Sequence, residues 1–151
     1  NTSQGIVNFL WNTKRAKDEE EKMRAHAEQV LKQIDMYSHK DDMVNELPYG
    51  LRKMTELGRT LMIDPKMILL DEPAAGLNPS ERQEFIQHLK DVYDSGIDLF
   101  LIEHNMDVVM SISHYITVIN FGAKIAEGEP KEVVNNPEVI KAYLGSRFKA
   151  E

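Results

Sequence analysis

Two adjacent carboxylates, Asp71 and Glu72, stand directly after the apolar run Met67–Leu70. A short continuous apolar run predicts a strand buried on both faces of a parallel sheet, and such sheets bind ligands beyond the carboxyl ends of their strands. One carboxylate there can hold Mg²⁺, directly or through water, while the other orients or deprotonates a nucleophilic water. The alternative is that the acidic pair belongs to a solvated loop with no function, which is the commoner case after an arbitrary apolar strand.

A third candidate side chain follows a second apolar run. His104 lies just after Leu99–Ile102, in the polar stretch Glu103–Asn105. The two apolar runs are separated by a helical pattern, so we expect a βαβ unit whose strand ends open on the same edge of the sheet. This topology predicts that His104 lies close to Asp71 and Glu72. A lone His after a strand is otherwise more often a hydrogen-bonded polar residue without a catalytic role.

The helix between the two strands has a strong start signal. Asn78 suits the N-cap, Pro79 the first helical position and Glu81 the third. One face is then apolar, and Gly96 predicts the end of the helix. The apolar positions are Phe85, Ile86, Leu89, Val92 and Tyr93.

Two more helices are predicted before the first strand. The first is predicted over residues 14–36, which contain no Gly or Pro. Residues 1–12, before it, are interpreted as a connector. The charged run at 14–24 is interpreted as a solvated face, with docking to a partner as the minority alternative. Apolar residues recur at helical spacing in the first of these helices at Met23, Ala27, Val30, Leu31 and Ile34.

The second of these helices begins near Pro48 and Gly50 and carries Gly58 on its apolar stripe. A helix start offers free N–H groups and a positive dipole end to an anion, and Gly50 would let a phosphate approach closely. Taken alone this signal is weak, because most helix starts that contain Gly bind nothing. Gly58 predicts close helix packing rather than function.

After the second apolar strand, we expect a short helix at 106–112, a hairpin over 115–128 and two helices starting at Pro130 and Pro137.

Composition limits the function classes. The 151 residues include no cysteine, which excludes disulfides and thiolate metal sites. A formal net charge of -7 argues against a general nucleic-acid binder, because neutralising phosphates requires clustered Lys and Arg. The longest apolar runs are far shorter than the ~18 residues of a membrane span.

Together the motifs resemble one family over nearly the whole chain, the nucleotide-binding subunits of ABC transporters. Leu47–Leu51 is similar to the family's signature motif and Met67–Glu72 to its Walker B strand. Ala74–Asn78 resembles the D-loop, and His104 resembles the switch-loop His. Within the family, the chain is most similar to the ATP-binding subunits of branched-chain amino acid importers. The lipopolysaccharide-export ATPase is a nearer relative than most.

The resemblance implies an α/β fold, the C-terminal portion of a P-loop NTPase domain of the ABC ATPase type, with a helical subdomain and part of a RecA-like, mainly parallel sheet. Residues 1–61 would form the connector and helical subdomain with the signature motif, and residues 62–151 the partial core. The implied cofactors are ATP and Mg²⁺. Asp71 would support the metal, Glu72 would act on the attacking water, and His104 would contact the γ-phosphate.

The resemblance also implies partners. Gly50 and Tyr49 would face the nucleotide bound by a second ATPase subunit, identical or not, and Asn78 would help to link the two ATP sites. The helical subdomain would contact transmembrane permease subunits at the inner, cytoplasmic face of the cell membrane.

Two departures from the family pattern stand out. The signature motif has Pro48 and Tyr49 where most members have Ser and Gly, which removes a hydroxyl and an easy backbone donor. There is no Gly-x-x-x-x-Gly-Lys-Ser/Thr motif to cradle phosphates, and the loop with a Gln that should precede the helical subdomain is missing.

We therefore expect a C-terminal part of a longer chain, with about ninety residues missing, that is inactive alone and has unpaired strand edges. The competing hypotheses are an exporter or soluble ABC ATPase and a non-catalytic interaction fragment. Retention of Asp71, Glu72 and His104 speaks against the fragment hypothesis.

Overall fold

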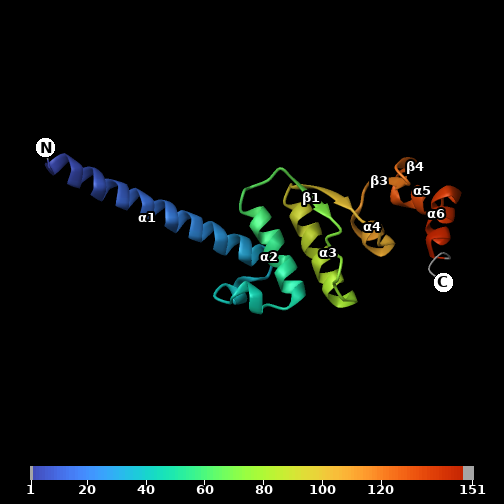
Figure 1. The fold of residues 1–151 in the computed structure, drawn as a ribbon, viewed down its shortest axis with the longest axis horizontal. Coiled ribbons are helices and arrows are strands. Elements are labelled where there is room, and N and C mark those ends of the chain that lie inside the picture. The colour runs from blue at the N-terminus through green and yellow to red at the C-terminus, as the bar shows by residue number, and fades with distance from the viewer. Residues whose placement is uncertain (1, 148–151) are drawn as a thin grey trace. The chain divides into compact units, whose positions relative to one another are not determined.

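The computed structural model describes residues 2–147, and side chains within residues 15–143 (Figure 1). Two compact units are present, one built from the chain up to Leu69 with Gly76–Phe100, the other from Leu70–Ala75 with the chain from Leu101 onwards. The elements in chain order are α1 (Thr2–Gln33), two single 3₁₀ turns (Tyr37–His39 and Val44–Glu46), α2 (Tyr49–Leu61), β1 (Met67–Asp71), α3 (Pro79–Asp94), β2 (Asp98–Ile102), α4 (Met106–Ile112), β3 (Ile116–Asn120), β4 (Ala123–Gly128), α5 (Pro130–Val134) and α6 (Pro137–Arg147).

The first unit has a helical core. The C-terminal end of α1 packs on α2, and α2 packs on α3 (Figure 1). The predicted role of Gly58 in close packing is confirmed, because a Cβ there would lie only 2.7 Å from Cδ1 of Ile34. The largest fully buried side chains of this unit are Ile34, Leu89 and Val92. Most of the predicted apolar stripes of α2 and α3 therefore lie in this core, but Tyr93, predicted on the stripe of α3, is 40% exposed because it lies in the last turn of that helix.

Helix α1 differs from the prediction at its N-terminal end. It begins at Thr2, so the segment interpreted as a connector is helical, while the side chains of residues 2–14 lie outside the described part. Met23, predicted on the apolar face, is 66% exposed, whereas Val30 is buried. Exposed ion pairs of Arg15 with Glu19 and Arg24 with Glu28 line this stretch. Among the described side chains of this region, Val30 and Ile34 pack against Gly58 of α2, whereas Met23 lies further from that contact and stays exposed.

Strands β1 and β2 run side by side in a two-stranded sheet. Asp98 N donates to Lys66 O at one end and Glu72 N donates to Ile102 O at the other, so the strands are parallel, as a βαβ unit requires. The prediction that these strands are buried on both faces is wrong. Side chains alternate along a strand, and Ile68 is buried while Leu69 is 73% exposed. In β2, Phe100 and Ile102 are likewise exposed.

The second unit contains the predicted hairpin. Strands β3 and β4 pair antiparallel, with a bulge between Val118 and Ile119. The predicted starts of α5 and α6 are confirmed, since each helix begins at a proline. On β4, Lys124 Nζ lies 2.8 Å from the Glu127 carboxylate, and this hydrogen bond raises the pKa of Lys124. Within the described residues, no helix combines the length and hydropathy needed to cross a bilayer.

Candidate active site

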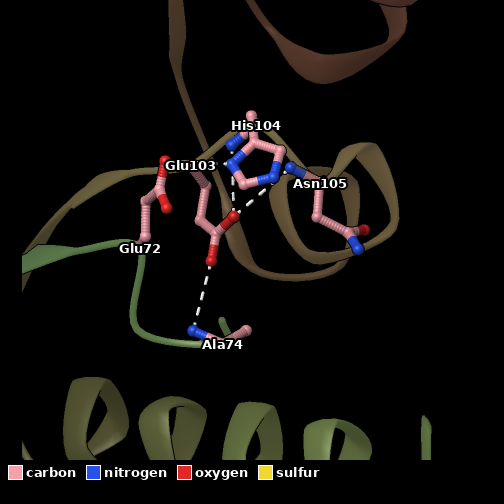
Figure 2. Close-up of polar contacts among 5 residues, drawn as sticks. All are labelled: Glu72, Ala74, Glu103, His104 and Asn105. Carbon is pink, nitrogen blue, oxygen red and sulfur yellow. Dashed lines mark hydrogen bonds and ion pairs between the residues drawn. The ribbon is translucent and has the colours of Figure 1, made fainter. Parts of the chain in front are cut away.

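Glu72 and His104 meet at the ends of the two parallel strands (Figure 2). Nδ1 of His104 lies 3.1 Å from Oε1 of Glu72, and both side chains are exposed, by 75% and 51%. With Glu72 ionised, the contact requires the His104 tautomer that carries a proton on Nδ1, because a carboxylate only accepts hydrogen bonds. The predicted proximity of His104 and Glu72 is therefore confirmed. An exposed ion pair contributes at most about 1 kcal/mol, so other contacts must hold the two side chains in place.

The backbone at Glu72 is unusual. Its φ is 44°, in the left-handed region that a residue with a Cβ adopts at a cost of roughly 1–2 kcal/mol. Glu72 N donates to Ile102 O at 2.8 Å, one residue beyond the end of β1, and Ala75 N donates to Glu72 O at 3.1 Å. Glu72 thus ends the strand and begins a tight turn in which Pro73 and Ala74 are buried. This turn directs the Glu72 side chain towards His104 (Figure 2).

Asp71 is the last residue of β1 and is exposed. Among the residues that the structure describes, no group of three or more His, Asp or Glu side chains is arranged to hold a metal ion. A preformed all-protein cage is therefore absent from this part of the chain. The donor set fits Mg²⁺ in a different way, because this ion is usually bound by one or two carboxylates together with substrate phosphates and water. Asp71 can supply one such carboxylate.

Glu103, the residue before His104, belongs to the candidate site although no sequence motif predicts a role for it. Its carboxylate accepts hydrogen bonds from Ala74 N at 3.2 Å, His104 N at 3.1 Å and Asn105 N at 3.3 Å (Figure 2). The available signal was its place at the same strand end as His104. Nothing in the sequence marked its side chain as turned towards the Glu72–Ala75 turn.

The start of α2 lies in the first unit. Pro48 is the N-cap, and its side chain makes no capping hydrogen bond. Gly50 is half-buried, and a Cβ at this position would lie 3.1 Å from Cδ and Oε1 of Glu81. The positive dipole end of a helix favours an anion, whereas the neighbouring carboxylate of Glu81 opposes one. Tyr49 is 48% exposed, and its ring lies beside Gly76.

Asn78 is the N-cap of α3, as predicted. Its Oδ1 accepts hydrogen bonds from Ser80 N and Glu81 N. In turn, Glu81 Oε2 accepts a hydrogen bond from Asn78 N at 2.9 Å. This reciprocal capping box occupies the side-chain oxygen of Asn78. Its Nδ2 group is therefore the part of the side chain left to reach another molecule. The roles assigned to Asn78, Tyr49 and Gly50 in nucleotide binding remain predictions.

Two family profiles match the sequence. One, described as "ABC transporter", matches residues 2–75, and the other, "Branched-chain amino acid ATP-binding cassette transporter", matches residues 123–149. Among curated relatives, the high-affinity branched-chain amino acid transport ATP-binding protein BraF of Pseudomonas aeruginosa is 38% identical over 139 residues, 90% of this chain and 54% of BraF. LivG of Escherichia coli K12, with the same descriptive name, is 42% identical over 118 residues, 76% of this chain and 46% of LivG.

Solved structures give the same result. The ADP conformation of MJ1267, described as an ATP-binding cassette of an ABC transporter, matches with a TM-score of 0.76 and 34% identity, covering 82% of this chain and 50% of that one. A nucleotide-free cassette from an ABC transporter matches with a TM-score of 0.75 and 33% identity, over 82% of this chain and 50% of that chain. The predicted fold class is confirmed. The chain spans about half the length of the relatives it matches.

Proposed function

Because the chain belongs to the ABC transporter ATP-binding family, we propose that it is part of an ATPase subunit that powers the import of branched-chain amino acids. The observation that carries the proposal is the 3.1 Å contact between Glu72 and His104 at the ends of two parallel strands. The names of BraF and LivG support the choice of solute. Import, rather than export, is proposed from the resemblance of the motifs to the ATP-binding subunits of branched-chain amino acid importers.

In the proposed reaction, water attacks the γ-phosphate of ATP. Glu72 orients this water or takes its proton, and His104 contacts the γ-phosphate from the neighbouring strand end. The exposure of both side chains leaves them accessible to a nucleotide and to water. Asp71, at the same strand end, would hold Mg²⁺ together with phosphate oxygens and water. The metal, when bound, would neutralise the charge on the phosphates.

Partners complete the proposed subunit. A second ATPase subunit, identical or homologous, would bring its nucleotide to Gly50 and Tyr49 at the start of α2, where the N-cap Pro48 makes no side-chain capping bond. Asn78 would connect the two sites through its remaining Nδ2 group. Residues 1–61, as the helical subdomain, would dock on transmembrane permease subunits at the cytoplasmic face of the membrane. Residues 62–151 would carry the chemistry.

We also propose that the 151 residues alone do not hydrolyse ATP. The sequence contains no Gly-x-x-x-x-Gly-Lys-Ser/Thr motif, so it has no backbone cradle and no Lys for the phosphates. Asp71 and Glu72 place negative charge towards a polyanion. Titration calorimetry of the 151-residue chain with Mg-ATP tests this point. No binding tighter than millimolar is expected, and sub-millimolar affinity would contradict it.

The transport function is tested on a subunit of the relatives' full length that carries this sequence. It should hydrolyse ATP, co-purify with permease subunits and drive uptake of leucine, isoleucine or valine into vesicles. Asp98→Asn, at the exposed beginning of β2, is a control variant that should leave hydrolysis unchanged. A full-length subunit that co-purifies with no permease and drives no uptake would overturn the transport function. Efflux of lipid-linked substrates instead of uptake would favour the exporter alternative.

A further inference from the structure

The carboxylate of Glu103 joins two segments that are 29 residues apart in the sequence. Its Oε1 accepts from Ala74 N, in the turn that follows Glu72, and its Oε2 accepts from the backbone of His104 and Asn105 (Figure 2). The two oxygens therefore serve different segments. One segment carries the Glu72 side chain and the other carries the His104 side chain.

The turn after Glu72 depends on this bridge. Ala75 N closes the turn on Glu72 O, and Pro73 has no N–H group. Ala74 N is the remaining donor of the turn, in a residue that is only 5% exposed. A buried backbone donor requires an acceptor, and Glu103 Oε1 provides it. The bond fixes the turn one residue away from Pro73 and two residues from Glu72.

Glu72 and His104 need such support. Both are exposed, and exposed ion pairs are weak and screened by salt. Glu72 also has a left-handed backbone, which persists only where neighbouring contacts determine it. Glu103 is half-buried and makes charge-assisted bonds to backbone groups on both sides, and such bonds are stronger than neutral ones.

We propose that Glu103 is a positioning residue that holds the Glu72 carboxylate and the His104 ring within hydrogen-bond reach of each other. The proposal rests on the ATPase function proposed above. Glu103 does not touch the reacting atoms in this arrangement. It acts through the backbone of the two segments that carry those side chains.

The test is Glu103→Gln in the full-length subunit. Gln has a single carbonyl oxygen, so it can accept from one segment only, and its NH₂ group faces an N–H donor of the other. We expect kcat for ATP hydrolysis to fall roughly 10- to 100-fold, with KM for ATP within about twofold of the parent. Asp98→Asn, which removes an exposed carboxylate at the other end of β2, is the matched control and should leave kcat unchanged.

Two further measurements separate positioning from a general charge effect. Glu103→Asp keeps the charge but is one methylene shorter, so it cannot reach both segments and should also lose activity. Amide hydrogen exchange at Ala74 should accelerate in Glu103→Gln, while exchange at Glu72, whose N–H bonds to Ile102 O, stays slow. Full activity in Glu103→Asp would assign the effect to charge and overturn the proposal.

The outcomes also distinguish this proposal from the function on which it rests. A parent that hydrolyses ATP and a Glu103→Gln variant with unchanged kcat would remove the role of Glu103 and leave the ATPase function standing. A parent that does not hydrolyse ATP would overturn the ATPase function. In that case the amide exchange rate at Ala74 still tests whether Glu103 bonds to Ala74 N. An unchanged rate in Glu103→Gln would show that this bridge does not exist in solution.

Discussion

The segment from Glu72 to Glu81 is held by different physical means at its two ends. In the second unit, the turn Glu72–Ala75 is held by directed hydrogen bonds, with Glu103 as the shared acceptor. In the first unit, Gly76 lies against the ring of Tyr49, so closely that a Cβ would be 2.9 Å from Cε1 of the ring. The Asn78–Glu81 capping box follows. We therefore expect the turn Glu72–Ala75 to depend on the carboxylate oxygens of Glu103. The loop at Gly76 should instead be disturbed by the addition of one methyl group.

The largest expected effect is on the chemistry at the hydrogen-bonded end. Glu72→Gln keeps the shape of the side chain and removes the proposed general base, so ATP hydrolysis by the full-length subunit should fall about 10²–10⁴-fold. ATP binding and the free energy of unfolding should change little. The measurement is steady-state hydrolysis, with Glu84→Gln on the exposed face of α3 as control. Activity within about threefold of the parent would be too small a loss for a general base.

His104→Ala tests the other half of the same contact. Loss of the ring removes the contact to Glu72 and the proposed contact to the γ-phosphate, so kcat should fall about 10²-fold, as it does when one transition-state donor is removed. The side chain is 75% exposed, and the melting temperature should therefore stay near that of the parent. Unchanged hydrolysis would reduce His104 to a surface residue.

At the packed end, Gly76→Ala should destabilise the protein through shape alone. The φ of Gly76 is 78°, which costs an Ala roughly 1–2 kcal/mol, and the contact with Tyr49 should add about 1 kcal/mol. Gly96→Ala is the matched control, since Gly96 has a φ of 96° and no atom within 4 Å of its Cβ position. The free energy of unfolding from denaturant titration measures both.

Gly76→Ala should lower the free energy of unfolding more than Gly96→Ala does, and this difference should disappear in a Tyr49→Ala background. A double-mutant cycle isolates this coupling from the backbone strain that both glycine positions share. If Gly76→Ala and Gly96→Ala cost the same amount with Tyr49 present, the ring does not restrict the Gly76 loop.

The smallest expected effect concerns the cap of α3. Asn78→Ala removes the acceptor of two backbone N–H groups and should lower the free energy of unfolding by about 1 kcal/mol. Asn78→Asp retains the acceptor and should be close to the parent. Equal destabilisation by both substitutions would mean that the Nδ2 group, rather than the cap, matters at this position.

Local signals and one topological rule were enough to predict much of the candidate site. Asn78, with Pro79 and Glu81, predicted the start of α3 because capping is a short-range interaction. The proximity of Glu72 and His104 followed from the βαβ connection, which brings the ends of parallel strands to one edge. The first inference depends on residues that are near one another in the chain. The second depends on the right-handed βαβ connection between parallel strands.

Other features were beyond the reach of sequence patterns. Periodicity predicts which face of an element is apolar, but not whether another element covers that face, and Met23 and Leu69 are exposed for this reason. The bridge through Glu103 needs the position of Ala74 N, which depends on the left-handed backbone of Glu72. No local pattern around Glu103 contains that information.

The close approach at Gly58 has a mechanical consequence. Ile34, at the end of α1, leaves no room there for even one additional carbon atom, and Val30 Cγ1 lies 3.7 Å from the same point. Interlocked side chains at close-packed density cannot slide past one another without opening a void. A displacement of α2 at Gly58 must therefore move Ile34 and Val30 with it, or else open a void between the two helices.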